Sequence, residues 1–288
     1  MRILLTGGGG FLGGYLIPQL LASGVHVTAL SRQKRISDHP NLDWIQMDLA
    51  EGIDAKKLPK SIDGVIHLAQ SPEYRNGPDG EAHVLKVNVV SYTQLLKYAE
   101  KANANCFITA STGSVYEPFT GTMLEDSLPK PTGFYGASKL AAENLSHAFS
   151  SRMKICNLRI FFLFGPAQKK SFITRLFDTV KTGDTVTLPA EGDGLIFVPT
   201  LAKNTANVFN TALQEGWTGT YNVASPHAIS VKDMALAVGK ASGKTVSFDR
   251  NSQGNPSPIV PPVQALSEIY NMENFSTFED ALNDFNFT

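Results

Sequence analysis

The stretch LLTGGGGFLGG, residues 4–14, places six glycines among eleven residues, directly after an apolar segment. The segment RILLT (2–6) predicts a short strand, and apolar spacing over residues 11–23 predicts a helix that Gly24 ends. A glycine turn between a strand and a helix predicts a diphosphate site, because the helix N-terminus offers unpaired N–H groups and the positive end of its dipole.

Two glycine spacings fit this site. One is G-x-x-G-x-x-G, and the other, which starts at Gly8, is the more widespread G-x-G-x-x-G. The second and third glycines of either pattern are the same residues, and the two residues between them open the helix. The residues predicted to bind a dinucleotide here are Gly7, Gly10, Phe11, Leu12 and Gly13.

The end of the second predicted strand, VHVTAL (25–30), indicates which dinucleotide is bound. An acidic residue at this place would hold a ribose 2′-hydroxyl, but here Ser31 and Arg32 occur, with Lys34 and Arg35 nearby. A hydroxyl beside a guanidinium accommodates a 2′-phosphate, so we expect NADP in preference to NAD. The alternative is a solvated basic loop.

The third predicted strand, WIQM (44–47), is followed by Asp48 and Leu49. We expect this pair to lie near the adenine, although a plain surface aspartate would give the same pattern.

Three more apolar runs, at 64–69, 106–110 and 154–160, predict further strands, and residues 81–102 and 134–150 predict helices between them. Six strands with crossover helices predict an α/β fold, a doubly wound parallel sheet of the Rossmann type, over residues 1–165. Residues 166–288 predict a smaller substrate-binding part with shorter elements, some of which can return to the main sheet.

The composition excludes several classes of partner. The 25 basic and 26 acidic residues give a net charge of -1, without the basic surface that nucleic acid or an anionic membrane would require. The N-terminus lacks the pattern of a secretory signal, so we expect a cytoplasmic location. Cys106 and Cys156 each lie inside an apolar run, which predicts buried thiols and no metal site.

A second motif indicates chemistry. In FYGASKLAAE (134–143), Tyr135 and Lys139 are four residues apart, on one face of a predicted helix. A nearby ammonium would lower the pKa of the phenol, so that Tyr135 could exchange a proton with a substrate hydroxyl or carbonyl. Lys139 would also hold the nicotinamide ribose.

Together these motifs resemble the extended short-chain dehydrogenase/reductase family, in its epimerase/dehydratase branch of sugar-nucleotide enzymes. The segments that carry the resemblance are TGGGGFLGG, VIHLA, ASTGSVYE, YGASKLAAE, LRIFFLFGP and TYNVAS, in the family's order. The resemblance implies that Thr112, four residues before Tyr116, is the catalytic Ser/Thr that hydrogen-bonds the reacting oxygen. It also implies a homodimer, and cofactor contacts at Leu68, Ala69, Asn88 and Thr109. His67 is expected to be a packed core histidine.

Some positions depart from the family's pattern. The acidic pair that dehydratases carry after the catalytic Thr is replaced by Gly113 and Ser114, so dehydration is not expected. Phe162 replaces an asparagine that contacts substrate, and beyond residue 159 only Arg175 and Arg250 remain to clamp a diphosphate. Lysines could take that role as point charges, namely Lys169, Lys170 and Lys181.

Three functions fit this sequence. The first is an NADPH-dependent reductase in which Tyr135 protonates a keto group of a sugar or sugar nucleotide. The second is an NAD-dependent epimerase, which removes a hydride and returns it to the other face of the sugar. The third is a cofactor sensor without catalysis, against which the intact Thr112, Tyr135 and Lys139 argue.

Overall fold

The computed structural model describes residues 1–169 and 171–286, so Lys170 lies outside the described residues. The chain divides into two compact units. The first unit comprises Met1–Ile160 and Thr205–Asn222, and the second comprises Phe161–Asn204 and Val223–Thr288.

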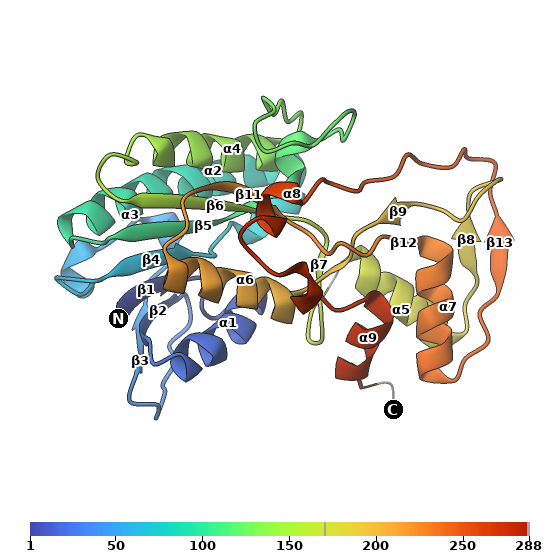
Figure 1. Cartoon of the computed structure of the whole chain (residues 1–288), viewed down its shortest axis with the longest axis horizontal. Coiled ribbons are helices and arrows are strands. Elements are labelled where there is room, and N and C mark those ends of the chain that lie inside the picture. The colour runs from blue at the N-terminus through green and yellow to red at the C-terminus, as the bar shows by residue number, and fades with distance from the viewer. Residues whose placement is uncertain (170, 287–288) are drawn as a thin grey trace. The chain divides into compact units, whose positions relative to one another are not determined.

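The first unit is built on a seven-stranded sheet (Figure 1). Its elements, some of which extend into the second unit, are β1 (Arg2–Thr6), α1 (Phe11–Ala22), β2 (His26–Ser31), β3 (Leu42–Gln46), β4 (Gly64–His67), α2 (Glu81–Leu85), α3 (Ser91–Lys101), β5 (Cys106–Thr112), α4 (Phe134–His147), β6 (Lys154–Ile160), α6 (Ala202–Glu215) and β11 (Gly219–Val223). The strand order is β11-β6-β5-β4-β1-β2-β3, and the pairs from β6 to β3 are parallel.

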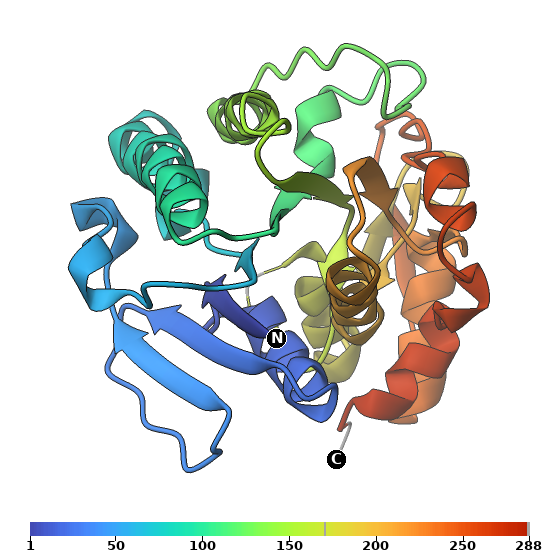
Figure 2. The ribbon, with the colours of Figure 1, turned by 60° about the vertical axis from the view of Figure 1, so that its left-hand side comes forward.

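This order confirms the doubly wound fold, and it adds β11 to the six strands that were predicted. Helices α2, α3 and α4 cover one face of the sheet, whereas α1 and the part of α6 in this unit cover the other (Figures 1 and 2). The predicted helix 81–102 forms α2 and α3, joined by a π-helical turn at Lys86–Val90.

Apolar strand residues form the core under α3 and α4. Leu4, Val65 and Phe107, from three neighbouring strands, pack with Tyr92 and Leu95 of α3, and all five side chains are inaccessible to solvent. Strands covered on both faces must be apolar throughout, which explains their continuous hydrophobic runs. The two cysteines are free and buried, as predicted.

The second unit contains shorter elements. They are β7 (Leu163–Phe164), α5 (Phe172–Thr182), β8 (Val186–Leu188), β9 (Ile196–Phe197), β10 (Thr200–Leu201), β12 (Ile229–Ser230), α7 (Val231–Ser242), β13 (Phe248–Arg250), α8 (Gln264–Ser267) and α9 (Phe278–Ala281). An aromatic core holds them together, in which Phe164 and Phe278 lie 5.4 Å apart between ring centroids. Phe162 packs edge-on against Phe197 at 4.9 Å, within the same unit.

Within the described ranges, no helix has the length and apolar character needed to cross a bilayer. Those residues also contain no cluster of three or more His, Cys, Asp or Glu that could hold a metal ion.

Candidate active site

The glycine turn between β1 and α1 leaves no room for side chains at two positions. Gly7 has a φ of +70°, and a Cβ there would lie 2.8 Å from the backbone nitrogen of Ala69. A Cβ at Gly13 would lie 2.5 Å from the carbonyl oxygen of Gly8, because α1 packs directly against the turn. Gly10 closes the turn, with its N–H donating to the Gly7 carbonyl at 2.9 Å. The geometry therefore uses the G-x-x-G-x-x-G spacing.

The N-terminus of α1 fits the diphosphate of a dinucleotide. Gly10 is its N-cap and has no side chain, so it cannot cap the N–H groups of the first turn. Phe11 and Leu12 occupy that turn, and the Leu12 side chain is only 8% exposed, so Leu12 can contribute only its backbone. A cradle without side chains at a helix N-terminus is the arrangement that binds phosphate.

The end of β4 lies against this turn. The backbone carbon of Leu68 and the nitrogen of Ala69 are the atoms that a Cβ at Gly7 would meet. The Ala69 N–H donates to the Thr6 hydroxyl at 3.4 Å, and that hydroxyl bonds Nδ1 of His67 at 2.8 Å. Burial, with Lys139 as a smaller cause, lowers the pKa of His67 to about 3, so it is a neutral core histidine as expected.

Ser31 and Arg35 flank the turn at Gly9. A Cβ on Gly9 would lie 3.1 Å from Oγ of Ser31 and 2.9 Å from Nε of Arg35, whose guanidinium also donates to the Gly9 carbonyl at 3.2 Å. The same guanidinium lies 5.3 Å from the ring centroid of Trp44. Arg32, which the sequence favoured, is exposed, and its carbonyl accepts a hydrogen bond from Gln46 at 3.1 Å. The structure thus brings Arg35 to the glycine turn.

Asp48 and Leu49 follow β3. The Asp48 carboxylate is exposed and accepts from the Ala50 N–H at 2.9 Å, which caps a short 3₁₀ helix. The Leu49 side chain is 8% exposed and packs in the core. Leu49 could therefore meet a cofactor only through its backbone.

Asn88 and Thr109 direct their side chains to protein partners. The buried Asn88 amide accepts from the Ser71 N–H at 3.0 Å and donates to the Ser138 hydroxyl at 3.0 Å. The Thr109 hydroxyl bonds the Tyr92 hydroxyl at 2.8 Å in the core. These side chains support the site's framework, and their predicted contacts with a cofactor stay a prediction.

The three predicted catalytic residues come together. Tyr135 and Lys139 are one turn apart on α4, and Thr112 ends β5, where its hydroxyl accepts from the Ser114 N–H at 3.2 Å and lies close to the Tyr135 phenol. Lys139 is 3% exposed, and its ammonium donates to the Ala110 carbonyl at 2.8 Å. The four-residue spacing therefore correctly predicted that Tyr135 and Lys139 lie on one face of a helix.

The expected lowering of the Tyr135 pKa is wrong for this structure. Burial raises the pKa of Tyr135, and the hydrogen bond with Thr112 opposes that effect only in part. Lys139 does not lower it here, because the Lys139 ammonium lies against a backbone carbonyl of β5. Burial also lowers the pKa of Lys139 to about 8, against a smaller opposite effect of Glu143.

A buried polar network continues from Lys139 along α4. The Glu143 carboxylate, one turn further, pairs with the Arg159 guanidinium at 2.8 Å, and these side chains are 2% and 5% exposed. Ser111 also donates to Glu143, and Arg159 donates to the Tyr116 hydroxyl at 2.5 Å. Neither Glu143 nor Arg159 was predicted, although a charged residue inside an apolar strand run such as KICNLRI signals a buried ion pair.

Gln70 is a second residue that the sequence did not indicate. The Tyr135 hydroxyl donates to Oε1 of Gln70 at 2.6 Å. The signal available was its place directly after the fourth apolar strand run, where polar residues of parallel sheets gather at one edge.

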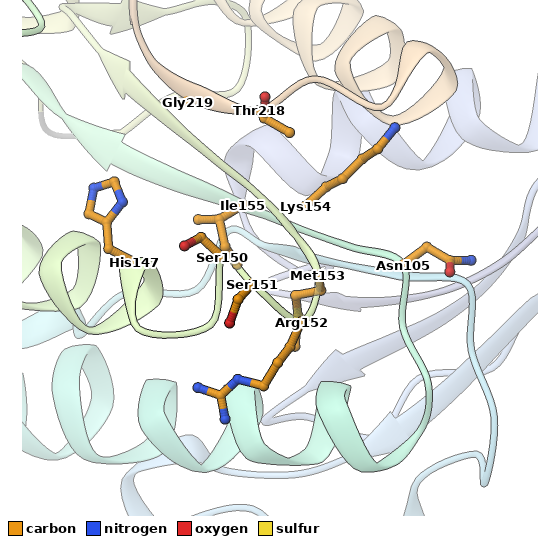
Figure 3. A pocket seen from close by; sticks show the side chains of 10 residues that line it. All are labelled: Asn105, His147, Ser150, Ser151, Arg152, Met153, Lys154, Ile155, Thr218 and Gly219. Carbon is orange, nitrogen blue, oxygen red and sulfur yellow. The ribbon is translucent and has the colours of Figure 1, made fainter.

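A cavity of about 590 Å³ lies elsewhere in the first unit (Figure 3). Asn105 and Lys154, at the amino ends of β5 and β6, line it, with His147 and Arg152. Thr112 lies at the carboxyl end of β5, so the cavity belongs to the opposite edge of the sheet. None of its ten lining residues was predicted as a site residue.

Known proteins are similar to this chain in sequence. The sequence model described as "NAD dependent epimerase/dehydratase family" matches residues 3–224. An uncharacterized UDP-glucose epimerase of Bacillus subtilis is 24% identical over 98% of this chain and 96% of its own length. UDP-glucuronic acid decarboxylase 1 of Xenopus tropicalis is 24% identical over 98% of this chain and 70% of its own length.

A solved structure is similar over nearly the whole chain. The UDP-glucuronic acid 4-epimerase of Bacillus cereus, in complex with UDP-glucuronic acid and NAD, has a TM-score of 0.84 and 26% identity, covering 99% of this chain and 97% of that one. The matched region contains the glycine turn, Thr112, Tyr135 and Lys139. The chain therefore belongs to the NAD-dependent epimerase/dehydratase family.

Proposed function

We propose that this chain is a nicotinamide-dependent epimerase of a nucleotide-linked sugar. The observation that carries the proposal is the convergence of Thr112, Tyr135 and Lys139 beside the carboxyl end of β5. The similarity of the chain to UDP-sugar epimerases supports epimerisation over the net reduction that the sequence alone favoured. UDP is the nucleotide carried by the substrates of those relatives, and we extend it to this chain.

The residues divide the work as follows. A dinucleotide bound at the glycine turn supplies the acceptor and donor of a hydride. Thr112 holds the reacting oxygen of the sugar, and Tyr135 exchanges a proton with that oxygen at its Oη atom. Lys139, with a pKa of about 8, remains mostly an ammonium at pH 7 and binds the nicotinamide ribose. The second unit binds the sugar nucleotide.

We further propose that the cofactor is NADP, with NAD as the weaker ligand. Ser31 and Arg35 lie together at Gly9, where a 2′-phosphate would meet a hydroxyl and a guanidinium. The substitution Arg35→Ala should weaken NADP binding by about 10- to 100-fold, because it removes one charge-assisted hydrogen bond to the 2′-phosphate. NAD binding should change little. Arg32→Ala is the matched control, and both affinities follow from fluorescence titration. A larger loss in the control would return the role to Arg32.

A reductase is the second candidate, because two observations favour it. Arg35 at the turn suits NADPH, and burial keeps the Tyr135 phenol protonated, the form that gives a proton to a keto oxygen. A pure sensor is disfavoured, because it would not need Thr112, Tyr135 and Lys139 in one cluster. The cytoplasmic location and the homodimer belong to the same proposal, and light scattering tests the dimer.

One experiment separates the candidates. The nucleotide that copurifies is released and identified, and the protein is then incubated with UDP-sugars and with their keto forms. An epimerase converts one UDP-sugar into its isomer without net change in nicotinamide absorbance, whereas a reductase oxidises one NADPH per product. Tyr135→Phe should reduce either activity by at least about 100-fold with cofactor binding retained. Full activity of that variant would refute the catalytic assignment.

A further inference from the structure

The Gln70 side chain contacts the Tyr135 hydroxyl, the group that transfers the proton in the proposed reaction. Its Oε1 accepts the only proton of the Tyr135 hydroxyl at 2.6 Å, so the Tyr135 oxygen can act toward any other group only as an acceptor. The Thr112 hydroxyl in turn accepts from the Ser114 N–H. The proton of the Tyr135 hydroxyl is thus directed at the Gln70 amide.

The segment that carries Gln70 also holds the Tyr135 ring. The ring centroids of Tyr74 and Tyr135 lie 4.8 Å apart. The Arg75 guanidinium lies 4.9 Å from the centroid of the Tyr74 ring. One short segment therefore contacts both the ring and the hydroxyl of the catalytic phenol.

This segment is firmly anchored next to Gln70. The buried Ser71 donates its N–H to the Asn88 amide at 3.0 Å, and its hydroxyl bonds Nδ1 of His83 at 2.8 Å. Further on, Gly80 packs so closely on the carbonyl of Glu73 that a side chain would not fit. The backbone next to Gln70 is therefore held by buried partners, although the Gln70 side chain itself is exposed.

We propose that Gln70 is a positioning residue that orients the Tyr135 O–H and holds it as the proton donor until a substrate oxygen takes the place of the amide. An acceptor that bonds the neutral phenol favours the neutral form over the phenolate. The exposure of Gln70 to solvent suits this role, because a substrate must reach the Tyr135 hydroxyl from solvent and replace the Gln70 amide there. The inference rests on the proposed function, since it takes Tyr135 as the acid and base.

The contact can be tested without turnover. Protein labelled with 3-fluorotyrosine is titrated by ¹⁹F NMR, and Tyr135→Phe assigns the resonance among the 8 tyrosines. Gln70→Glu keeps an acceptor and adds a negative charge, so it should move the Tyr135 titration upward by about one pH unit or more. Gln253→Glu, at an exposed glutamine of the second unit, makes the same chemical change as a control and should leave the resonance unmoved.

Activity then gives the second readout. Gln70→Leu removes the acceptor and should lower kcat by about tenfold with the cofactor Kd unchanged, the effect of one lost hydrogen bond. Gln70→Glu should recover most of that loss and shift the basic limb of the pH profile upward. A Tyr135 titration identical in wild type and Gln70→Glu would overturn the inference, whereas an active Tyr135→Phe would overturn the proposed function instead.

Discussion

The glycine turn and the catalytic group lie in the same unit, at the carboxyl ends of β1 and β5, which β4 separates in the sheet, but they are built differently. At the turn, the ligand cradle consists of backbone, and Gly7 and Gly13 matter because side chains there would strike other backbone atoms. In the catalytic group, the Lys139 ammonium has a carbonyl partner in β5, Ala110, and the Tyr135 hydroxyl has a side-chain partner, Gln70.

This difference determines how each region should respond to substitution. A backbone cradle is damaged by adding atoms, whereas a buried polar group is damaged by removing a partner. The second kind of damage is larger, because an unpaired buried charge has neither water nor a counterion around it.

The largest effect is therefore expected for Glu143→Ala, next to the catalytic group. It leaves the Arg159 guanidinium buried without its carboxylate, and should reduce the free energy of unfolding by about 3–5 kcal/mol. Denaturant unfolding followed by circular dichroism measures this change.

The matched variant removes both charges. Glu143→Leu combined with Arg159→Met fills similar volume without ions and should be less destabilised than Glu143→Ala alone. If the double variant is the less stable of the two, the ion pair contributes net stability and the comparison between the regions must be revised.

At the turn, Gly13→Ala should cost about 1–3 kcal/mol of stability, the usual range for an overpacked site. Cofactor binding should weaken as well, because α1 can accommodate the methyl group only by moving away from the turn. Calorimetry and fluorescence titration measure the two changes.

Gly14→Ala is the control on the same helix. A Cβ there meets nothing within 4 Å, so this change should stabilise α1 by about 0.5–1 kcal/mol and leave binding unchanged. Equal effects at Gly13 and Gly14 would show that helix propensity, and not the close approach, governs the turn.

The two regions also differ in how well the sequence predicted them. The turn was readable because glycine spacing and the flanking strand and helix are local, and β1 has the predicted bounds. The helical spacing of Tyr135 and Lys139 was readable for the same reason. Their partners were not, because Ala110 lies in β5 and Gln70 lies in the loop after β4, and nothing in the spacing of α4 selects them.

The same limit explains why the sequence favoured Arg32, whereas the structure places Arg35 at the glycine turn. The sequence favoured the arginine directly after β2, but the chain bends beyond it, and the guanidinium of Arg35 reaches back to Gly9 and Trp44. A loop path of a few residues cannot be derived from composition.

His67 connects the two regions and provides the smallest and most selective test. It bonds Thr6 beside the glycine turn, and its pKa, lowered to about 3 by burial and by Lys139, is far below the ordinary value near 6.5. Between these values the unfolded chain binds a proton that the folded chain does not, so stability falls as pH decreases through this window and levels off below pH 3. From pH 7 to 5.5 the expected loss from this group is about 1 kcal/mol. Denaturant unfolding at several pH values should show that His67→Gln lacks this loss of stability, while His227→Gln, at an exposed histidine, retains it. If the free energy of unfolding of wild type and of His67→Gln changes with pH in parallel, His67 is protonated in the fold. The core between the turn and Lys139 would then be more accessible to water than the burial of this ring indicates.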